Sequence, residues 1–286
     1  MLRVDGFIKI SKKNTEIRKQ DILDKLDFLQ DDIAFIAGSL IEEEVNPLSK
    51  GMGNRLSDID CFILTDSIVD IGVNETGYSF GNRKTRFDRI MGINFDTEIY
   101  PKKAVLHYAD QINNLKFDME QRAYNWISNR DHSFSIWNLN SVIHRLLNSV
   151  PLYNQEGYRL LLDGLNKDNF FRFNVILAIN EVEVRYDDIV GNLETSQFEV
   201  AVHSARDALN SAMKAYIFYR KTSFDRDRWI PLKLKNLAEA DAQASEIYNE
   251  YRLLNFASPL STDDEYRNNI KGIIKFINRV TNLLEG

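Results

Sequence analysis

Two patterns of hydrophobic and polar positions divide the chain. In about the first 100 residues the apolar positions form short runs bounded by turn-forming residues, a pattern typical of strands. The segments Ile33–Ala37 and Ile59–Thr65 are mostly apolar and predict buried strands. A third segment alternates with period 2, which predicts a strand with one acidic face: Phe95, Thr97 and Ile99 alternate with Asp96, Glu98 and Tyr100.

From about residue 102 onward the apolar positions recur every three to four residues, which predicts helices. The predicted helices lie near residues 104–128, 134–148, 168–187, 195–220, 231–255 and 263–284. One earlier helix is predicted over 12–30, residues 40–57 are expected to be mostly loop, and residues 66–93 a hairpin or loop. The predicted fold class is α+β: a mixed sheet flanked by helices over 1–103, followed by an α-helical bundle over 104–286.

Composition narrows the class of function. Of the 286 residues, 44% are hydrophobic and 27% charged, and the formal net charge is −6, which favours a soluble globular protein. The chain begins without a signal-peptide pattern, contains no apolar run of membrane-spanning length and has a single cysteine, so we expect a cytoplasmic protein with no membrane association. A protein that grips long nucleic acid usually has a basic surface, so the acidic balance argues against that partner.

The candidate chemistry begins with acidic residues on the predicted strands. Side chains two apart on a strand point to the same face, so Asp58 and Asp60 can reach one small volume. Carboxylate oxygens are the ligands that Mg²⁺ prefers. Asp96 and Glu98 share a face of the later strand, and either can supply a third ligand or a general base. Alternatively, Asp58 caps a turn and Asp60 lies on a solvated face.

A Gly-Ser pair, Gly38-Ser39, ends the first apolar run. Glycine lets the backbone approach a ligand closely, and the serine hydroxyl with neighbouring N–H groups can hold anionic oxygens. Gly38-Ser39, Asp58-Ile59-Asp60 and the acidic strand with Asp96 and Glu98 together resemble the motifs of the DNA polymerase β-like nucleotidyltransferase superfamily. The resemblance covers roughly residues 20–101 and so falls within the predicted 1–103 domain.

The resemblance implies a nucleotidyltransferase catalytic domain with two Mg²⁺ ions. It would transfer a nucleoside monophosphate from an NTP, with ATP the expected donor, and release pyrophosphate. Carried over by position, Asp58 and Asp60 are metal ligands, and Gly38 and Ser39 contact the triphosphate. Glu98 is the preferred third carboxylate, with Asp96 as the alternative.

The chain departs from the family pattern in the segment between Ser39 and Asp58, which is longer than usual. Glu42, Glu43 and Glu44 within it are expected to form a solvated helix face. Arg55 lies next to the metal strand and is a candidate for binding phosphate.

Two further groups of charged residues can be explained either as functional residues or as ordinary solvent-exposed residues. The basic stretch Arg83–Arg89 either holds phosphates or forms the solvated tip of a hairpin, and the second is preferred. In the predicted bundle, one helix face carries His203, Asp207, Asn210 and Lys214. This face either lines a nucleotide cleft, with Lys214 as a binding residue, or is the solvent side of an amphipathic helix.

Together these observations predict an enzyme that joins an NMP group to a hydroxyl of a small-molecule acceptor, either an antibiotic or a secondary metabolite. The alternatives are a protein or tRNA acceptor, as in toxin–antitoxin systems, and a non-catalytic nucleotide-binding module. A homodimer is left open.

Overall fold

The computed structural model describes residues 6–72, 76–118, 121–128, 134–256 and 259–285. Contacts between Cα atoms divide the chain into two compact units: residues 1–115 with 127–166, and residues 116–126 with 167–286. The first unit contains the large sheet and also α3 (Lys102–Asn113), α4 (Ile136–Leu147) and α5 (Gln155–Asp163), so it extends well beyond the predicted boundary at residue 103. None of the described helices is long and apolar enough to cross a lipid bilayer.

The large sheet of the first unit has six strands in the order β5-β6-β7-β4-β3-β8. Its strands are β3 (Ile33–Ala37), β4 (Ile59–Thr65), β5 (Tyr78–Phe80), β6 (Arg83–Ile90), β7 (Ile93–Pro101) and β8 (Val150–Tyr153). β4 and β7 are parallel, whereas the other neighbours are antiparallel. The sheet is therefore mixed, and the predicted α+β fold class, with helices following the sheet, is confirmed.

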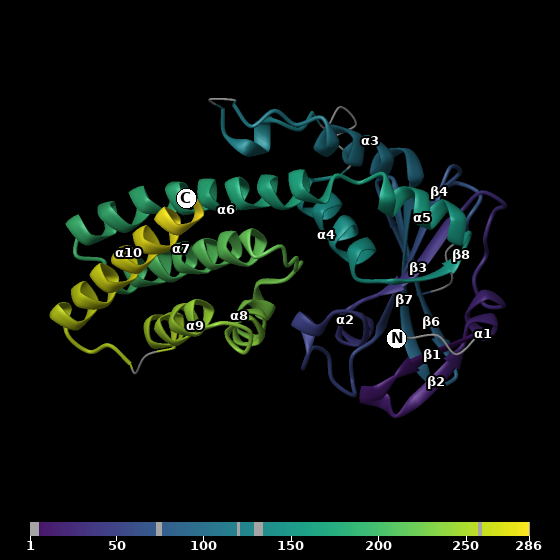
Figure 1. Cartoon of the computed structure of the whole chain (residues 1–286), viewed down its shortest axis with the longest axis horizontal. Helices are drawn as coiled ribbons and strands as arrows, with labels where there is room; N and C mark the ends of the chain where they lie inside the picture. The colour runs from purple at the N-terminus through teal and green to yellow at the C-terminus, as the bar shows by residue number, and fades with distance from the viewer. Residues whose placement is uncertain (1–5, 73–75, 119–120, 129–133, 257–258, 286) are drawn as a thin grey trace. The chain divides into compact units, whose positions relative to one another are not determined.

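Elements cover both faces of this sheet (Figure 1). On one side lie a hairpin of β1 (Phe7–Ile10) and β2 (Thr15–Arg18), with α1 (Lys19–Leu23) and α2 (Ser39–Val45). Ile8, Ile17, Ile36 and Cys61 belong to the buried core on that side. On the other side lie α3 (Lys102–Asn113), α4 (Ile136–Leu147) and α5 (Gln155–Asp163).

An aromatic row stabilises the second side. The Phe35 and Phe62 rings stack at 5.3 Å, and Phe62 and Tyr100 stack at 6.3 Å. Phe134 then packs on Tyr100 at 5.4 Å, and Tyr158 of α5 on Phe35 at 5.9 Å. Offset ring pairs of this kind contribute about 0.5–1.5 kcal/mol beyond burial.

Several local predictions are corrected. The helix predicted over 12–30 is wrong over most of its length, because β2 and the short α1 occupy its first half. The segment 40–57 is not mostly loop, since it contains α2 and a 3-10 turn at Pro47–Ser49. The expected hairpin at 66–93 is confirmed by β5 and β6, although residues 73–75 lie outside the described residues.

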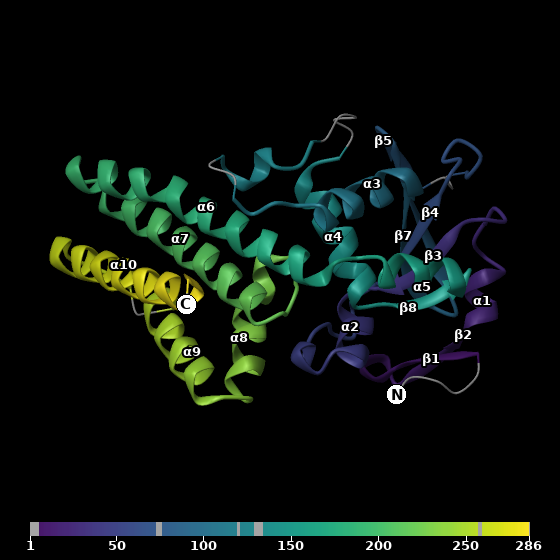
Figure 2. The same ribbon diagram turned by 45° about the horizontal axis from the view of Figure 1, so that its top comes forward.

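The second unit is helical. It contains the long pair α6 (Lys167–Glu194) and α7 (Phe198–Tyr219), which run side by side in both views (Figures 1 and 2). α8 (Ile230–Ala238) and α9 (Ala242–Asn255) take the place of the single helix predicted over 231–255, and α10 (Asp263–Glu285) packs on α7. The helix predicted over 104–128 ends at Asn113, and a 3-10 turn at Ala123–Asn125 follows. Residues 119–120 lie outside the described residues.

Candidate functional site

The Gly-Ser turn lies directly against the first aspartate strand. β3 ends at Ala37, which is paired with Asp60 of β4. Gly38 then has φ 90° and ψ 171°, and α2 begins at Ser39. A Cβ atom at Gly38 would be 2.9 Å from Asp60 Cγ and closer still to Oδ2. Only glycine fits here, because this backbone region is nearly restricted to glycine and a side chain would overlap the carboxylate.

The parallel pairing of β4 and β7 decides which carboxylates meet. Asp60 is in register with Asp96, so both side chains point to the same face of the sheet. Burial raises the pKa of Asp96 to about 6, and the charges of Asp58, Asp60 and Glu98 contribute to the same shift. This perturbation indicates that several negative charges act on Asp96, as at many functional sites.

Glu98 lies one step further along β7, opposite Phe62. Its Oε2 accepts a hydrogen bond from the Tyr100 hydroxyl at 2.7 Å and forms an ion pair with Arg83 Nη1 at 3.3 Å. Its charge is therefore compensated within the sheet. Of the two alternatives for the third carboxylate, the geometry favours Asp96 over Glu98.

Arg145 completes the site, and the sequence patterns do not single it out. Its Nη1 forms an ion pair with Asp60 Oδ2, and its guanidinium carbon lies 5.6 Å from the centre of the Phe62 ring. The Arg145 side chain is 11% exposed. The available signal is a charged pair, His144-Arg145, inside the apolar run Val142–Leu147 of a predicted helix.

A buried polar network joins the Gly-Ser helix to the helix of Arg145. His144 Nε2 lies 3.2 Å from Glu42 Oε2, and both side chains are almost fully buried. Ser49 donates a hydrogen bond to Glu42 at 2.8 Å, and the Asn148 side-chain amide lies 3.2 Å from His144 Nδ1. The prediction of a solvated face at Glu42 is therefore wrong. Its partner lies far away in the sequence, so no local pattern reveals the pair.

The other basic residues that the sequence suggested for phosphate binding differ from one another in their surroundings. Arg55 is exposed in the loop before β4, and its carbonyl oxygen accepts a hydrogen bond from Lys13. The basic stretch forms strand β6 rather than a solvated hairpin tip: Arg83 pairs with Glu98, and Arg86 is 8% exposed. Lys214 belongs to the second unit, where it forms ion pairs with two acidic residues of that unit, Glu181 at 3.2 Å and Asp227 at 3.0 Å.

The donor set can be tested against the magnesium ions that the resemblance implies. Among the residues that the structure describes, no three His, Cys, Asp or Glu side chains are grouped as ligands of one ion. Mg²⁺, however, usually takes one or two carboxylates, with phosphates and water completing its shell. Asp58 and Asp60 are such a pair, and burial together with their negative charges raises the pKa of Asp96. The donor set fits Mg²⁺ provided that Asp60 exchanges Arg145 for the ion.

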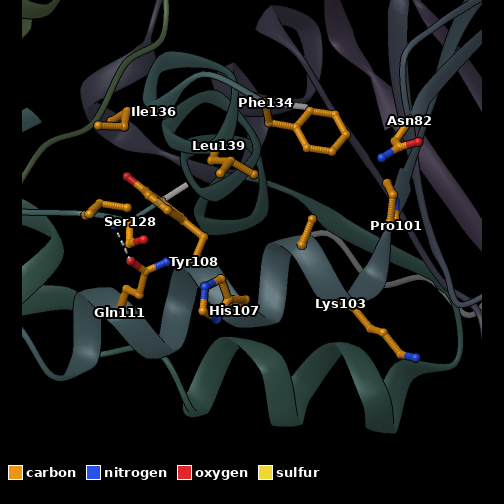
Figure 3. Close-up of a pocket in the computed structure, with 12 residues that line it drawn as sticks. Asn82, Pro101, Lys103, His107, Tyr108, Gln111, Ser128, Phe134, Ile136 and Leu139 are labelled. Atoms are coloured by element: carbon orange, nitrogen blue, oxygen red, sulfur yellow. Dashed lines mark hydrogen bonds between the residues drawn. The ribbon is translucent and has the colours of Figure 1, made fainter. Parts of the chain in front are cut away.

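A cavity of about 440 Å³ opens beside α3 in the first unit (Figure 3). Its apolar wall includes Phe134, Ile136 and Leu139. Its polar wall includes His107 and Gln111, whose side-chain oxygen accepts a hydrogen bond from the Ser128 backbone N–H at 2.7 Å. This mixture of apolar surface and a few polar groups is typical of small-molecule sites.

The cavity is connected to the carboxylates through the sheet. Pro101 lines it at the end of β7, and Phe134 packs on Tyr100, whose hydroxyl donates to Glu98. Asp96 and Tyr100 are four residues apart on the same face, about 13 Å along the strand. The cavity therefore lies at the far end of the row of side chains that begins with the aspartates.

Comparisons with known proteins give little further information. No protein-family model matches the chain, and no curated protein matches it. Among solved structures, the chain is similar to the crystal structure of a nucleotidyltransferase-like protein from Exiguobacterium sibiricum 255-15. The identity is 8%, the TM-score is 0.45, and the match covers 87% of this chain and 70% of that chain. A likeness at this TM-score carries no argument about function, so the interpretation rests on the geometry of the site.

Proposed function

We propose that this chain is a Mg²⁺-dependent nucleotidyltransferase that transfers NMP from an NTP to a hydroxyl of a small-molecule acceptor. The observation that supports this most strongly is the convergence of three adjacent strands. Asp60 of β4 is paired with Ala37, the last residue before the Gly38-Ser39 turn, and with Asp96 of β7. Asp58 directly precedes β4, and its charge acts on Asp96. The family resemblance implies phosphate contacts for Gly38 and Ser39 and metal binding for Asp58 and Asp60, with Glu98 preferred as the third carboxylate and Asp96 as the alternative.

In the proposed reaction the acceptor oxygen forms a bond to the α-phosphorus, and the bond from that phosphorus to the bridging oxygen breaks. The products are acceptor–O–NMP and pyrophosphate, and the acceptor proton passes to a carboxylate or to solvent. Asp58 and Asp60, with Asp96, would hold the metal. When bound, Mg²⁺ stabilises the attacking and leaving oxygens and lowers the pKa of the acceptor hydroxyl.

The protein side chains contribute mainly positioning and charge. Ser39 is half-buried, follows Gly38 at the start of α2, and can donate its hydroxyl to a phosphate oxygen. Arg55 is exposed close in sequence to Asp58, where its charge can attract the triphosphate. Asp96 is in register with Asp60 and would be the third carboxylate of the site.

The cavity beside α3 supports a small-molecule acceptor. Its volume lies in the range of drug-sized ligand sites. Pro101, which lines the cavity, is five residues along β7 from Asp96, so the cavity would bind the part of the substrate remote from the reacting phosphorus. Ala104→Phe, which would fill this cavity, should raise the KM for the acceptor and leave metal-dependent NTP binding unchanged.

The decisive experiment measures pyrophosphate release with each NTP and Mg²⁺ against a panel of hydroxylated small molecules, tRNA and candidate proteins. Asp58→Asn should abolish acceptor-dependent release, whereas Asp31→Asn, at an exposed position before β3, should not. Release that is unchanged in Asp58→Asn contradicts the proposal. Release with only tRNA or protein contradicts the small-molecule acceptor.

One observation favours a second candidate, a non-catalytic nucleotide-binding module. Asp60 is already paired with Arg145, an arrangement that a permanently metal-free site could also keep. Mg²⁺-dependent NTP binding without turnover on any acceptor would support this candidate.

A further inference from the structure

The ion pair between Arg145 and Asp60 places a permanent cation on a residue that the proposed function assigns to a metal ligand. Arginine stays protonated at all accessible pH values. A divalent cation on Asp60 would therefore meet a fixed positive charge, and the two repel each other strongly in a partly buried site. Arg145 and a metal ion cannot share Asp60 at low cost, so one must leave when the other binds.

The guanidinium also cannot simply turn into solvent. The Arg145 side chain is 11% exposed and packs over the Phe62 ring at 5.6 Å. Removing one partner from a buried pair is costly because the remaining charge stays uncompensated. A second anion close to Asp60 would let the guanidinium move away from Asp60 while keeping a charged partner.

The phosphates of a nucleotide would supply that anion. The Gly38-Ser39 turn lies against Asp60, so phosphates at the turn would also lie close to Arg145. The planar guanidinium donates two parallel hydrogen bonds to carboxylate and phosphate alike, so the same fork suits both partners. A short movement of the Arg145 side chain would then be sufficient to carry the guanidinium from Asp60 to the phosphates.

The backbone around Arg145 is held in place during such a movement. Its neighbour His144 is paired with Glu42 of α2, the helix that begins at Ser39. The helices that carry Arg145 and Ser39 are thus joined by a buried contact. The side chain can exchange partners while its Cα keeps a constant distance from the turn.

From these contacts we propose that Arg145 is a phosphate-binding residue that occupies Asp60 in the metal-free protein. When the metal–nucleotide complex binds, the guanidinium passes from Asp60 to the phosphates, and the cation takes its place on Asp60. This inference rests on the proposed function. It adds that the empty site is closed to free divalent cations and opens to them together with a nucleotide.

The test compares two affinities in Arg145→Gln. Calorimetry with Mg²⁺ alone should show tighter binding to the variant, by about threefold or more, because the competing charge is gone. Calorimetry with ATP in the presence of Ca²⁺, used as a divalent ion to slow turnover, should show weaker binding, by about tenfold or more, because a charge-assisted fork to phosphate is lost. The two changes have opposite signs, which a merely structural role would not produce.

Two further variants keep the test decisive. Arg145→Lys retains the positive charge but cannot donate two parallel hydrogen bonds, so it should leave Mg²⁺ binding weak and still lower ATP affinity. It also replaces Arg145→Gln in the test if that variant does not fold. Arg172→Gln removes a guanidinium that packs on Phe117 in the other unit, and should change neither affinity.

Changes of the same sign in Arg145→Gln, or an unchanged ATP affinity, would overturn the role of Arg145 while leaving the proposed function intact. Wild-type protein that binds neither Mg²⁺ nor nucleotide would overturn both.

Discussion

The close approach of Gly38 to Asp60 gives a prediction whose size can be worked from the structure. In Gly38→Ala the new Cβ would overlap the Asp60 carboxylate, and the backbone at φ 90° and ψ 171° is nearly restricted to glycine. A non-glycine residue in such a region costs about 1–3 kcal/mol. The Asp60 carboxylate must also turn away from its position beside Arg145.

The second contribution depends on the burial of that ion pair. The Arg145 and Asp60 side chains are 11% and 24% exposed. Breaking the pair should cost less than the roughly 3–5 kcal/mol of a fully buried pair and more than the roughly 0.2–1 kcal/mol of a surface pair. We expect Gly38→Ala to lower the free energy of unfolding by about 3–4 kcal/mol in total. At about 2–4 °C per kcal/mol for a chain near this size, the melting temperature should fall by about 6–16 °C.

Two controls separate the contributions, each followed by thermal and urea denaturation. Gly92 has φ +80°, and a Cβ added there would meet no other atom within 4 Å, so Gly92→Ala should show a backbone cost alone, of about 1–2 kcal/mol. In an Asp60→Ala background the clashing atoms are gone, and Gly38→Ala should then cost about 1–2 kcal/mol less than in the wild type. If Gly38→Ala costs no more than Gly92→Ala and the cycle shows no coupling, the contact with Asp60 has no energetic role and the reasoning is refuted.

Three shorter predictions follow from other contacts. In metal-free protein Asp96→Asn should raise the free energy of unfolding by about 1 kcal/mol at pH 8, discounted from the full shift because the side chain is half-exposed. The folded pKa of Asp96, about 6, lies above its ordinary value of 3.8. Wild-type stability is thus lost as the pH rises from about 4 to 6, and the advantage of the variant should vanish near pH 4 in urea titrations. Glu42→Gln should destabilise the fold by about 2–4 kcal/mol because it breaks a buried pair with His144. Glu156→Gln, which removes an exposed pair with Arg159, should cost far less. Equal losses on denaturation would contradict this. Burial raises the pKa of Cys61 to about 12, so a disulfide reagent should label it only after unfolding, and rapid labelling of native protein would place the strand elsewhere.

The sequence predicts those parts of the fold whose hydrophobic pattern is strong and local. β3, β4 and β7 follow from apolar runs and alternation, and the Gly38 turn follows from the end of a run. β8 and α5 do not follow from local pattern, because Pro151 indicates a break and the strand is held by its pairing with β3. The helix predicted over 12–30 rests on the four-residue step from Ile22 to Leu26, whereas β2 contains a single apolar residue, Ile17, and is stabilised by its pairing with β1.

The candidate site is predictable only as far as its residues lie on one strand or one turn. Asp58 and Asp60 share a face by alternation alone. Choosing between Asp96 and Glu98 requires the offset between β4 and β7, and two strands separated by a hairpin can pair in several registers with the same pattern of faces. Arg145 comes from a helix 85 residues after Asp60, so its role depends on how α4 crosses the sheet.

The negative charges on this face of the sheet explain why Arg145 is buried beside it. Asp60, Asp96 and Glu98 lie on two neighbouring strands, and Asp58 directly precedes the first of them. Burial and the charges of the other three carboxylates raise the pKa of Asp96. Arg83 offsets one of them from within the sheet. Arg145, which lies outside the sheet, offsets Asp60. The sequence therefore holds an indirect signal: several carboxylates predicted on one strand face require either a metal or a buried arginine, and the buried arginine is expected in the helix that covers that face. In this chain the helix predicted over 134–148 covers that face. The signal therefore points to the charged pair His144-Arg145 in this helix.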